Sequence, residues 1–509
     1  MSAPASATDA FAASSDRFTQ MLAWLDGAQA AGLTHAELED QLAAAGRDLL
    51  RQLLQDHLDL RAQRETRVAV VDTDGMAHGA VEPGHTRTLA TVFGPVTVTR
   101  LAYRRRSHAN LHPADAVLNL PVERHSHGLR RLAAVETTRG SFDAAVAAIG
   151  RATGQDLGKR QTEQLTARAS VDIDGFYADR ASPPADPDDM LVLSCDGKGI
   201  VVRPDALRPA TAKAAVDTKL ATRLSKGEKR NRKRMATVAA VYDVAPVART
   251  PADILPDPDH NDHASNAVDS GRDAAARCAP TATGKWLHAS VVDDTATVIT
   301  AMFDEAERRD PDHTRTWVAL VDGNTHQINR IAAGARDRDV AVTIIVDFVH
   351  VLEYLWRAAW SFYDEADPAA ETWVADKARA VLAGHATRVA AAIRRKATYH
   401  RLDSIRRANA DTAANYLVNK APYLDYATAL AAGWPIATGV IEGACRHLVK
   451  DRMDLTGARW SLHGAEAVLK LRALHANGDL NDYWNYHLAQ ERHRTHEQRY
   501  ANNLIPQAA

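Results

Sequence analysis

The stretch Leu191-Val-Leu-Ser-Cys-Asp-Gly197 decides the fold that we expect, because it is an apolar run that ends in a single acid. A second run of the same form, Trp317-Val-Ala-Leu-Val-Asp-Gly323, places its acid 126 positions later. Short apolar runs that end at a glycine are typical of buried strands. The two runs therefore predict two buried β-strands, with Asp196 at the end of the first and Asp322 at the end of the second.

A third acid, Glu442, lies 120 positions after Asp322, near the start of a helical pattern that runs to Met453. Cleaving or joining phosphodiesters calls for two divalent ions ~3.5–4 Å apart, which stabilise the attacking and the leaving oxygen. Mg²⁺ prefers carboxylate oxygens. Asp196, Asp322 and Glu442 therefore predict a catalytic centre for two Mg²⁺ or Mn²⁺ ions. The alternative is that each acid only caps a turn or a helix.

The sequence around the two aspartates alternates between strand and helix patterns. Strands are expected at 190–202, 235–242, 285–292, 317–321 and 340–346, and helices at 295–308, at 327–338 and from 350. This order, βββαβαβα, matches a ribonuclease-H-like α/β core with a mixed five-stranded sheet. The fold class is therefore α+β, with several domains, as expected for 509 residues.

We divide the chain into segments by pattern and composition. They are a helical region (1–80), a small β segment (81–128), a helix-turn-helix region (129–185), the first part of the catalytic core (186–363) with a loop insertion (204–284), an all-α insertion (364–434), the completion of the core (435–478) and a C-terminal tail (479–509). The tail is expected to be helical and partly disordered. The helix-turn-helix predicts DNA binding, and the alternative is that its two helices only pack against the rest of the protein.

Composition narrows the class of protein. The net charge is −2 and charged residues make up 25%, which is ordinary for a globular protein. Three cysteines lie far apart, so neither a disulfide framework nor a cysteine zinc ribbon is expected. The amino terminus lacks a secretory signal, and no apolar run approaches the ~20 residues of a membrane span. We expect a cytoplasmic protein associated with the bacterial nucleoid.

Basic residues gather at a few places where DNA phosphates could bind. Six of them stand in nine positions between the first two strands. Others follow Glu442, begin the second helix of the helix-turn-helix, or flank a tryptophan that could stack on an unpaired base. The candidates are Lys226, Lys229, Arg230, Arg232, Lys233, Arg234, Arg446, Lys450, Arg452, Lys159, Arg160, Arg459 and Trp460. Alternatively, the charges are only solvated and Trp460 belongs to the core.

Asp347 and His350 stand three positions apart at the start of a predicted helix, on one helix face. They could support the metal ligands, by orienting an acid or by contacting a phosphate. Asp347 could equally be an N-cap that His350 hydrogen-bonds locally. The sequence leaves both interpretations open.

The ordered set of motifs resembles the DDE transposases of bacterial insertion sequences, above all the ISKra-type group and more distantly Mutator- and hAT-like enzymes. The motifs stand at 194–199, 316–324, 344–356, 435–447 and 457–460. The resemblance implies the triad Asp196, Asp322 and Glu442, divalent metal, and transposition of DNA. It also implies double-stranded DNA partners, namely terminal inverted repeats and target DNA, and a homodimer or larger assembly. Asp347 stands where some relatives carry cysteine, and the cysteine zinc motif of some transposases is missing.

Three other interpretations remain at this stage. The chain could be a structure-specific nuclease of the ribonuclease-H class, which cuts branched DNA without terminal repeats. It could be a domesticated DNA-binding protein without catalysis, or a metal-free scaffold. All three acids are present, which argues against the domesticated protein.

Overall fold

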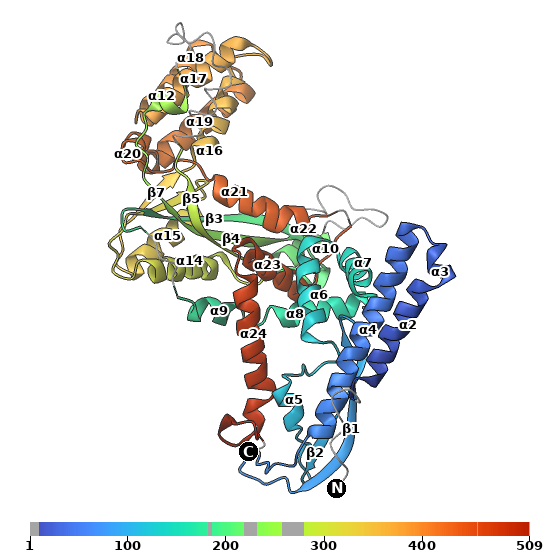
Figure 1. Ribbon diagram of the computed structural model, residues 1–509. Helices are drawn as coiled ribbons and strands as arrows, with labels where there is room; N and C mark the ends of the chain where they lie inside the picture. Colours follow the sequence, from blue (N-terminus) through green and yellow to red (C-terminus); the bar gives the residue numbers. More distant parts are fainter. Residues whose placement is uncertain (1–9, 182–185, 218–231, 257–278, 456, 508–509) are drawn as a thin grey trace. The chain divides into compact units, whose positions relative to one another are not determined.

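The computed structural model describes residues 10–181, 186–217, 232–256, 279–455 and 457–507 (Figure 1). The chain divides into two compact units. Unit 1 comprises Met1–Arg180 and Gly478–Ala509, and unit 2 comprises Ala181–Asn477. In the described part of the chain, no helix is both long and apolar enough to cross a membrane.

Unit 1 begins with helices that pack on a β-hairpin. The helices are α2 (Ala12–Asp26), α3 (Ala28–Ala31) and α4 (His35–Arg64), and the strands are β1 (Ala80–Thr91) and β2 (Gly94–Arg104). The strands are antiparallel, paired from Ala80↔Arg104 to Thr91↔Gly94. Leu58 of α4 joins Leu89, Val96 and Val98 of the hairpin in one apolar cluster, which holds the helix against the sheet.

A three-helix cluster follows the hairpin and the short helix α5 (Pro113–Val117). It consists of α6 (His127–Arg139), α7 (Phe142–Thr153) and α8 (Lys159–Ala169), and α9 (Ile173–Asp179) comes next. Gly154 ends α7 in the left-handed conformation, at φ 70°, which glycine adopts without strain. Both helices expected for the helix-turn-helix, α7 and α8, are therefore present.

The end of the chain belongs to unit 1. It forms α24 (Leu480–Thr495) and two short turns, η5 (Glu497–Arg499) and η6 (Ala501–Asn503). Arg130 of α6 is fully buried and lies 3.0 Å from the carboxylate of Glu491 on α24. A buried ion pair of this kind ties the two helices together. The expectation of a partly disordered tail is thus wrong for residues 480–495.

Unit 2 is built on a mixed five-stranded sheet, which the sequence predicted. Its strands are β3 (Met190–Val201), β4 (Lys233–Val244), β5 (Ala282–Ser290), β6 (Trp317–Val321) and β7 (Val342–Val346). Their order is β5-β4-β3-β6-β7. β3 pairs antiparallel with β4, and β4 with β5, whereas β3–β6 and β6–β7 are parallel. All five residues of β6 are buried, which explains its unbroken apolar sequence.

Two helices connect strands of this sheet and a third follows β7, and a polar side chain caps each one. They are α14 (Thr295–Arg309), α15 (Thr325–Asp337) and α16 (Phe348–Ala359), capped by Asp294, Asn324 and Asp347. Each cap accepts a hydrogen bond from an otherwise unpaired backbone N–H in the first turn. The predicted strands and helices of this core are confirmed, with ends that shift by a few residues.

The region predicted as an all-α insertion is helical. It contains α17 (Pro368–Leu382), α18 (Ala386–Tyr399), α19 (Ser404–Lys420), η3 (Ala421–Tyr423) and α20 (Tyr426–Ala431). The segment after β4 runs along it and includes α12 (Pro251–Ile254). There the N–H of Val247 donates to Gly433 and that of Arg249 to Leu430. Between β3 and β4 the structure describes η1 (Pro204–Ala206) and α10 (Pro209–Asp217).

A helical segment that carries Glu442 completes unit 2. It runs through α21 (Gly439–Ala444), the π-helical η4 (Cys445–Lys450) and α22 (Asp451–Met453), and α23 (Leu462–Ala476) follows. Figure 1 shows α21 along β3. A π-helical turn inside an α-helix is uncommon and is frequent at functional sites.

Candidate metal centre

Three aspartates stand at the same height across three neighbouring parallel strands: Asp196 lies inside β3, which continues to Val201, and Asp322 and Asp347 follow directly after β6 and β7. The expectation that Asp196 ends its strand is therefore wrong. The printed register pairs Ser194 with Leu320, so Asp196 and Asp322 each lie two residues beyond this pair. Val321 pairs with Val346, so Asp322 and Asp347 each lie one residue beyond that pair. The backbone N–H of Asp347 donates to Val321, at 2.8 Å. Because neighbouring strands lie ~4.8 Å apart, the three acids form a row at one edge of the sheet.

The segment α21–η4 adds further side chains to this row. The hydroxyl of Thr438, the residue before α21, contacts the carboxylates of both Asp347 and Glu442, the latter at 3.0 Å. One turn after Glu442, burial together with the nearby carboxylate of Asp196 raises the pKa of the Cys445 thiol. The segment thus contacts both ends of the aspartate row.

Ligand atoms of Asp347, His350 and Glu442 lie within 4.8 Å of one another, and these residues could hold a metal ion. Asp347 is fully buried, His350 half-buried and Glu442 exposed, so the group opens to solvent on the side of Glu442. The Asp347 carboxylate accepts hydrogen bonds from the N–H of Val349 at 2.8 Å and from His350 Nδ1 at 3.3 Å. Such bonds fix the orientation of a ligand before any metal arrives.

Charge in this group is balanced by a proton on His350. Burial works to raise the pKa of Asp347, but hydrogen bonds from His350 and Thr438 outweigh it, and the pKa is lowered. The hydrogen bond to Asp347 raises the pKa of His350 to about 9 against the effect of burial, and the charges of Asp347, Glu353 and Asp322 add to it. His350 is therefore protonated at neutral pH, and a metal that uses it as a ligand displaces this proton.

The predicted triad is only partly assembled as a ligand set. Asp196 and Asp322 are half-buried neighbours. Burial raises the pKa of the Cys195 thiol to about 12, and the charges of both aspartates contribute. The ligand atoms of Glu442, however, lie within 4.8 Å of those of Asp347 and His350. The ligand atoms of Asp196, Asp322 and Glu442 do not all lie within 4.8 Å of one another. Of the two interpretations of Asp347, the structure shows the N-cap and adds the contact with Thr438.

The helical insertion reaches Asp322 through Tyr416 of α19. The hydroxyl of Tyr416 donates to the carbonyl of Asp322 at 3.4 Å, and its ring stacks on Tyr354 with centroids 3.8 Å apart. Gly323 has a φ of 91°, and a Cβ there would stand 2.8 Å from the Tyr416 hydroxyl. Only glycine fits without strain. Thr438, Cys445 and Tyr416 were not predicted as site residues. Of the three, only Thr438 could have been recognised from the local sequence, as a residue that can precede a helix.

The residues predicted to bind DNA have different surroundings. Lys226, Lys229 and Arg230 lie outside the described residues. Arg232 is half-buried, whereas Lys233, Arg446, Lys450, Arg459, Lys159 and Arg160 are exposed. Lys159 is paired with Asp143 at 2.6 Å. Arg234 donates to the carbonyls of Val291 and Ala206, so its guanidinium holds the fold together.

Two of these predictions need correction. Trp460 is 5% exposed, and its indole N–H donates to the carbonyl of Met453, so it does not offer a face for an unpaired base. Arg452 is 2% exposed and lies over the Trp460 ring, 4.7 Å from its centroid. Burial, with the nearby charge of Arg472, lowers the pKa of Arg452 to about 10. This cation belongs to the core rather than to a DNA-binding surface.

Unit 1 holds a second group that could bind a metal ion, formed by Asp72, Asp74 and His108. Asp72 is buried and accepts hydrogen bonds from the backbone of Asp74 and Met76, at 3.0 and 2.8 Å. His78 holds the other carboxylate oxygen of Asp72 at 3.0 Å. This group stands on a turn rather than on strand ends.

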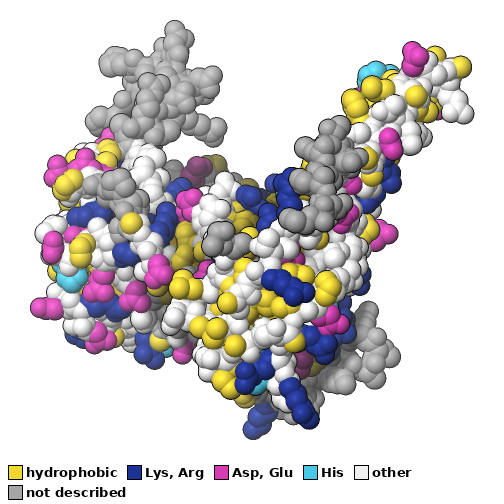
Figure 2. Space-filling model, turned by 60° about the horizontal axis from the view of Figure 1, so that its bottom comes forward, with side chains coloured by type: hydrophobic (Ala, Val, Ile, Leu, Met, Phe, Trp, Pro, Cys, Tyr) yellow, Lys and Arg dark blue, Asp and Glu magenta, His cyan; other side chains and the backbone are white. Residues whose placement is uncertain are grey.

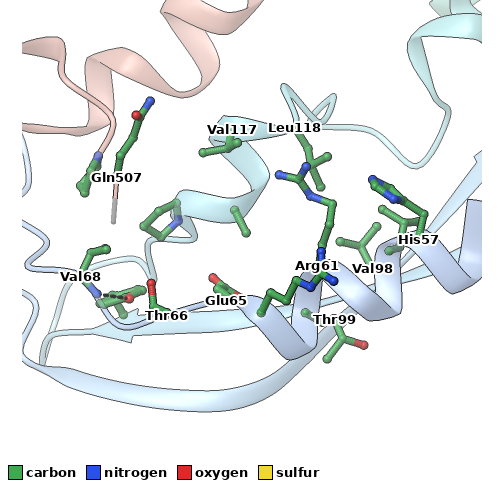
Figure 3. A pocket seen from close by; sticks show the side chains of 17 residues that line it. His57, Arg61, Glu65, Thr66, Val68, Val98, Thr99, Val117, Leu118 and Gln507 are labelled. Atoms are coloured by element: carbon green, nitrogen blue, oxygen red, sulfur yellow. Dashed lines mark hydrogen bonds between the residues drawn. The ribbon is translucent and has the colours of Figure 1, made fainter. Parts of the chain in front are cut away.

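A cavity of about 550 Å³ also lies in unit 1, between α4, β2 and the α5 region (Figure 3). Its walls combine Leu58 and Val98 with Arg61 and Glu65. The side chain of Glu65 accepts a hydrogen bond from the N–H of Leu101 at 2.8 Å. None of the candidate metal ligands lines this cavity.

No protein-family model matches the chain, and no curated protein is similar enough to match it. The function must therefore be argued from the geometry of the site.

Proposed function

We propose that the chain is a metal-dependent DNA transposase whose core has a ribonuclease-H-like fold. The observation that carries the proposal is the row Asp196, Asp322 and Asp347 across adjacent parallel strands, inside β3 and directly after β6 and β7, with Glu442 on a helical segment that touches it. The strand order β5-β4-β3-β6-β7, with β4 antiparallel to its neighbours, supports the fold assignment. The reaction that we propose, DNA cleavage and strand transfer, rests on the resemblance of the sequence motifs to those of DDE transposases.

In this proposal Asp196, Asp322 and Glu442 hold the metal ions, and Asp347 with protonated His350 positions Glu442. Two bound Mg²⁺ or Mn²⁺ ions would stabilise the attacking and leaving oxygens of an in-line displacement. The donor set fits such ions, because hard carboxylate oxygens on rigid strand ends are what Mg²⁺ prefers. Small shifts of the Glu442 side chain, which is exposed, would complete the set.

The proposed reaction has two displacements. Water first attacks a phosphorus at the end of the mobile element, and the bond to the 3′ oxygen breaks. The freed 3′-hydroxyl then attacks a phosphorus in target DNA, and one strand of the element is joined to the target. Both ends must be held together during the second step, so we expect a homodimer or a larger assembly.

The proposal is tested with duplex DNA taken from the flanks of the coding region, in the presence of MnCl₂. Purified protein should nick this DNA and join the cut end to a second duplex. Asp196→Asn, Asp322→Asn and Glu442→Gln should each reduce both products by more than the ~10–100-fold typical of changes behind the ligands. Asp337→Asn, an exposed acid at the end of α15, is the matched control and should act like wild type.

The alternatives predict different products. A structure-specific nuclease would cut branched DNA and yield no joined strand. A catalytically silent DNA-binding protein would yield neither product in Mn²⁺. If wild-type protein binds the flanking DNA but makes no cut, the transposase proposal is wrong.

A further inference from the structure

The turn between α18 and α19 exposes two large apolar side chains beside several arginines. Tyr399 ends α18 and is 83% exposed, and Ile405 in the first turn of α19 is 78% exposed. Exposed apolar side chains that stand together can contribute to a binding surface. The turn is well built: Asp403 accepts hydrogen bonds from the backbone of Ile405 and Arg406, both at 2.9 Å.

Basic residues outnumber acidic ones around this turn, although Asp364 and Asp411 lie 3.9 and 3.4 Å from Arg406 and Arg407. Residues 394–407 contain six basic residues and a single acid, Asp403. Figure 2 shows one face of the molecule, on which both basic and acidic side chains occur. A basic cluster on a chain of net charge −2 favours an anionic partner at this place.

Several of these cations are already used inside the protein. Lys396 turns inward to the Tyr363 hydroxyl at 2.6 Å, and Arg407 lies 3.4 Å from Asp411. Arg395 and Arg401 are exposed, and neither side chain has a partner among the described residues. Arg401 has a φ of 49° because it closes the C-terminal end of α18, where the N–H groups of Arg401 and Leu402 donate to the carbonyls of Thr398 and Ala397.

The turn stands at a defined distance from the metal centre. Tyr416, which touches Asp322, lies twelve residues after Ser404 on the same helix. At ~1.5 Å per residue, the start of α19 is ~18 Å from that contact. This length corresponds to about five base pairs of duplex at ~3.4 Å each.

We propose that the α18–α19 turn contacts the DNA duplex about five base pairs from the reacting phosphate. Arg395 and Arg401 bind backbone phosphates, and Tyr399 and Ile405 cover the apolar edge of the sugars and bases between them. The identity of the ligand as DNA rests on the proposed function. The apolar pair adds contact that does not depend on salt, and the arginines add contact that does.

The test uses the full chain, a fluorescent duplex and KCl titrations, with binding followed by anisotropy. Replacing both Arg395 and Arg401 by Ala should weaken binding about tenfold and reduce the slope of log K against log salt by about 2, since each phosphate contact contributes ~0.9. Tyr399→Ala should weaken binding severalfold and leave the slope unchanged. Arg336→Ala, an exposed arginine on α15, is the control and should change neither quantity.

The inference is wrong if the double variant keeps the affinity and slope of wild type, or if wild type binds no duplex. It is also wrong if Tyr399→Ala abolishes binding to vesicles of anionic lipid but not to DNA, which would mark a membrane surface. Mn²⁺ titrations of the same proteins separate the two proposals. If Glu442→Gln binds Mn²⁺ like wild type, the metal centre is wrong. If only the Arg395 and Arg401 double variant behaves like wild type in DNA binding, only the α18–α19 contact is wrong.

Discussion

The Cys445 thiol lies near the Asp196 carboxylate, one helical turn after Glu442, and burial together with that carboxylate raises the pKa of the thiol. The same segment meets Asp347 through Thr438. The helical segment that carries Glu442 begins some 120 positions after β6 in the sequence. It therefore lies against both ends of the row formed by Asp196, Asp322 and Asp347. This contact, rather than any single acid, defines the site.

The Cys445 contact predicts a graded effect of substitution. Cys445→Ala removes the thiol near Asp196 and should lower Mn²⁺ affinity by ~10-fold, the lower end of the range for groups behind a ligand. Cys445→Ser keeps a hydrogen-bond donor, so its Mn²⁺ affinity should fall less than that of Cys445→Ala. Isothermal titration with MnCl₂ measures both. Equal affinity in wild type and Cys445→Ala would show that the thiol does not orient Asp196.

The Thr438 hydroxyl has one proton, which can serve only one of the two carboxylates that it contacts at a time. Thr438→Val keeps the shape and removes the donor, so Asp347 and Glu442 should separate and Mn²⁺ affinity should fall by ~10–100-fold. Thr438→Ser restores the hydroxyl and should recover most of the affinity. If Val and Ser variants bind Mn²⁺ alike, the hydroxyl is not part of the site.

Gly323 should tolerate no side chain. Gly323→Ala places a Cβ 2.8 Å from the Tyr416 hydroxyl at a φ of 91°, and should cost ~1–3 kcal/mol of unfolding free energy. Tyr416→Phe in the same chain removes the nearest atom and should recover part of the loss. Gly443→Ala is the matched control, since nothing lies within 4 Å of its Cβ position. Urea unfolding measures all three, and an unchanged stability of Gly323→Ala would contradict the geometry.

His127 makes unit 1 less stable in mild acid. Its Nε2 donates to the carbonyl of Asn119 at 2.7 Å while Nδ1 accepts from Arg130 at 3.1 Å, so the neutral ring satisfies both contacts. Burial, with the nearby charge of Arg130, lowers the pKa of His127 to about 4. The folded pKa lies below the unfolded value of ~6.5. Stability from this group is therefore full above pH ~6.5 and is lost as pH falls toward 4, by up to about 3 kcal/mol.

The pH effect is checked by calorimetry of His127→Gln. Glutamine can keep both contacts but does not titrate, so its melting temperature should fall less than that of wild type between pH 6.5 and 4.5. His35→Gln, at an exposed histidine, should keep the wild-type slope. Parallel slopes for His127→Gln and wild type would show that another group controls the acid response.

The sequence predicts the parts of this fold that local pattern controls. β6 is found at Trp317–Val321, as expected, because a short strand buried along its whole length must be continuously apolar. The contact of Glu442 with Asp347 was not predictable in this way, since it depends on how a distant helix packs across the sheet. Arg452 and Trp460 could not be placed from the sequence either. A cation near an aromatic residue has the same sequence pattern whether the pair lies on the surface or, as here, in the core. α24 confirms the helical pattern expected for the tail, and it is held in place by buried side chains, which are Tyr483, Trp484, His487 and Glu491.

The central claim is that Asp196, Asp322 and Glu442 form one metal centre. Anomalous scattering from crystals soaked in MnCl₂ tests it most directly. The account predicts manganese within ~2.0–2.3 Å of carboxylate oxygens of Asp196, Asp322 and Glu442. Manganese bound only at Asp72, Asp74 and His108, with none near Asp322, would contradict it.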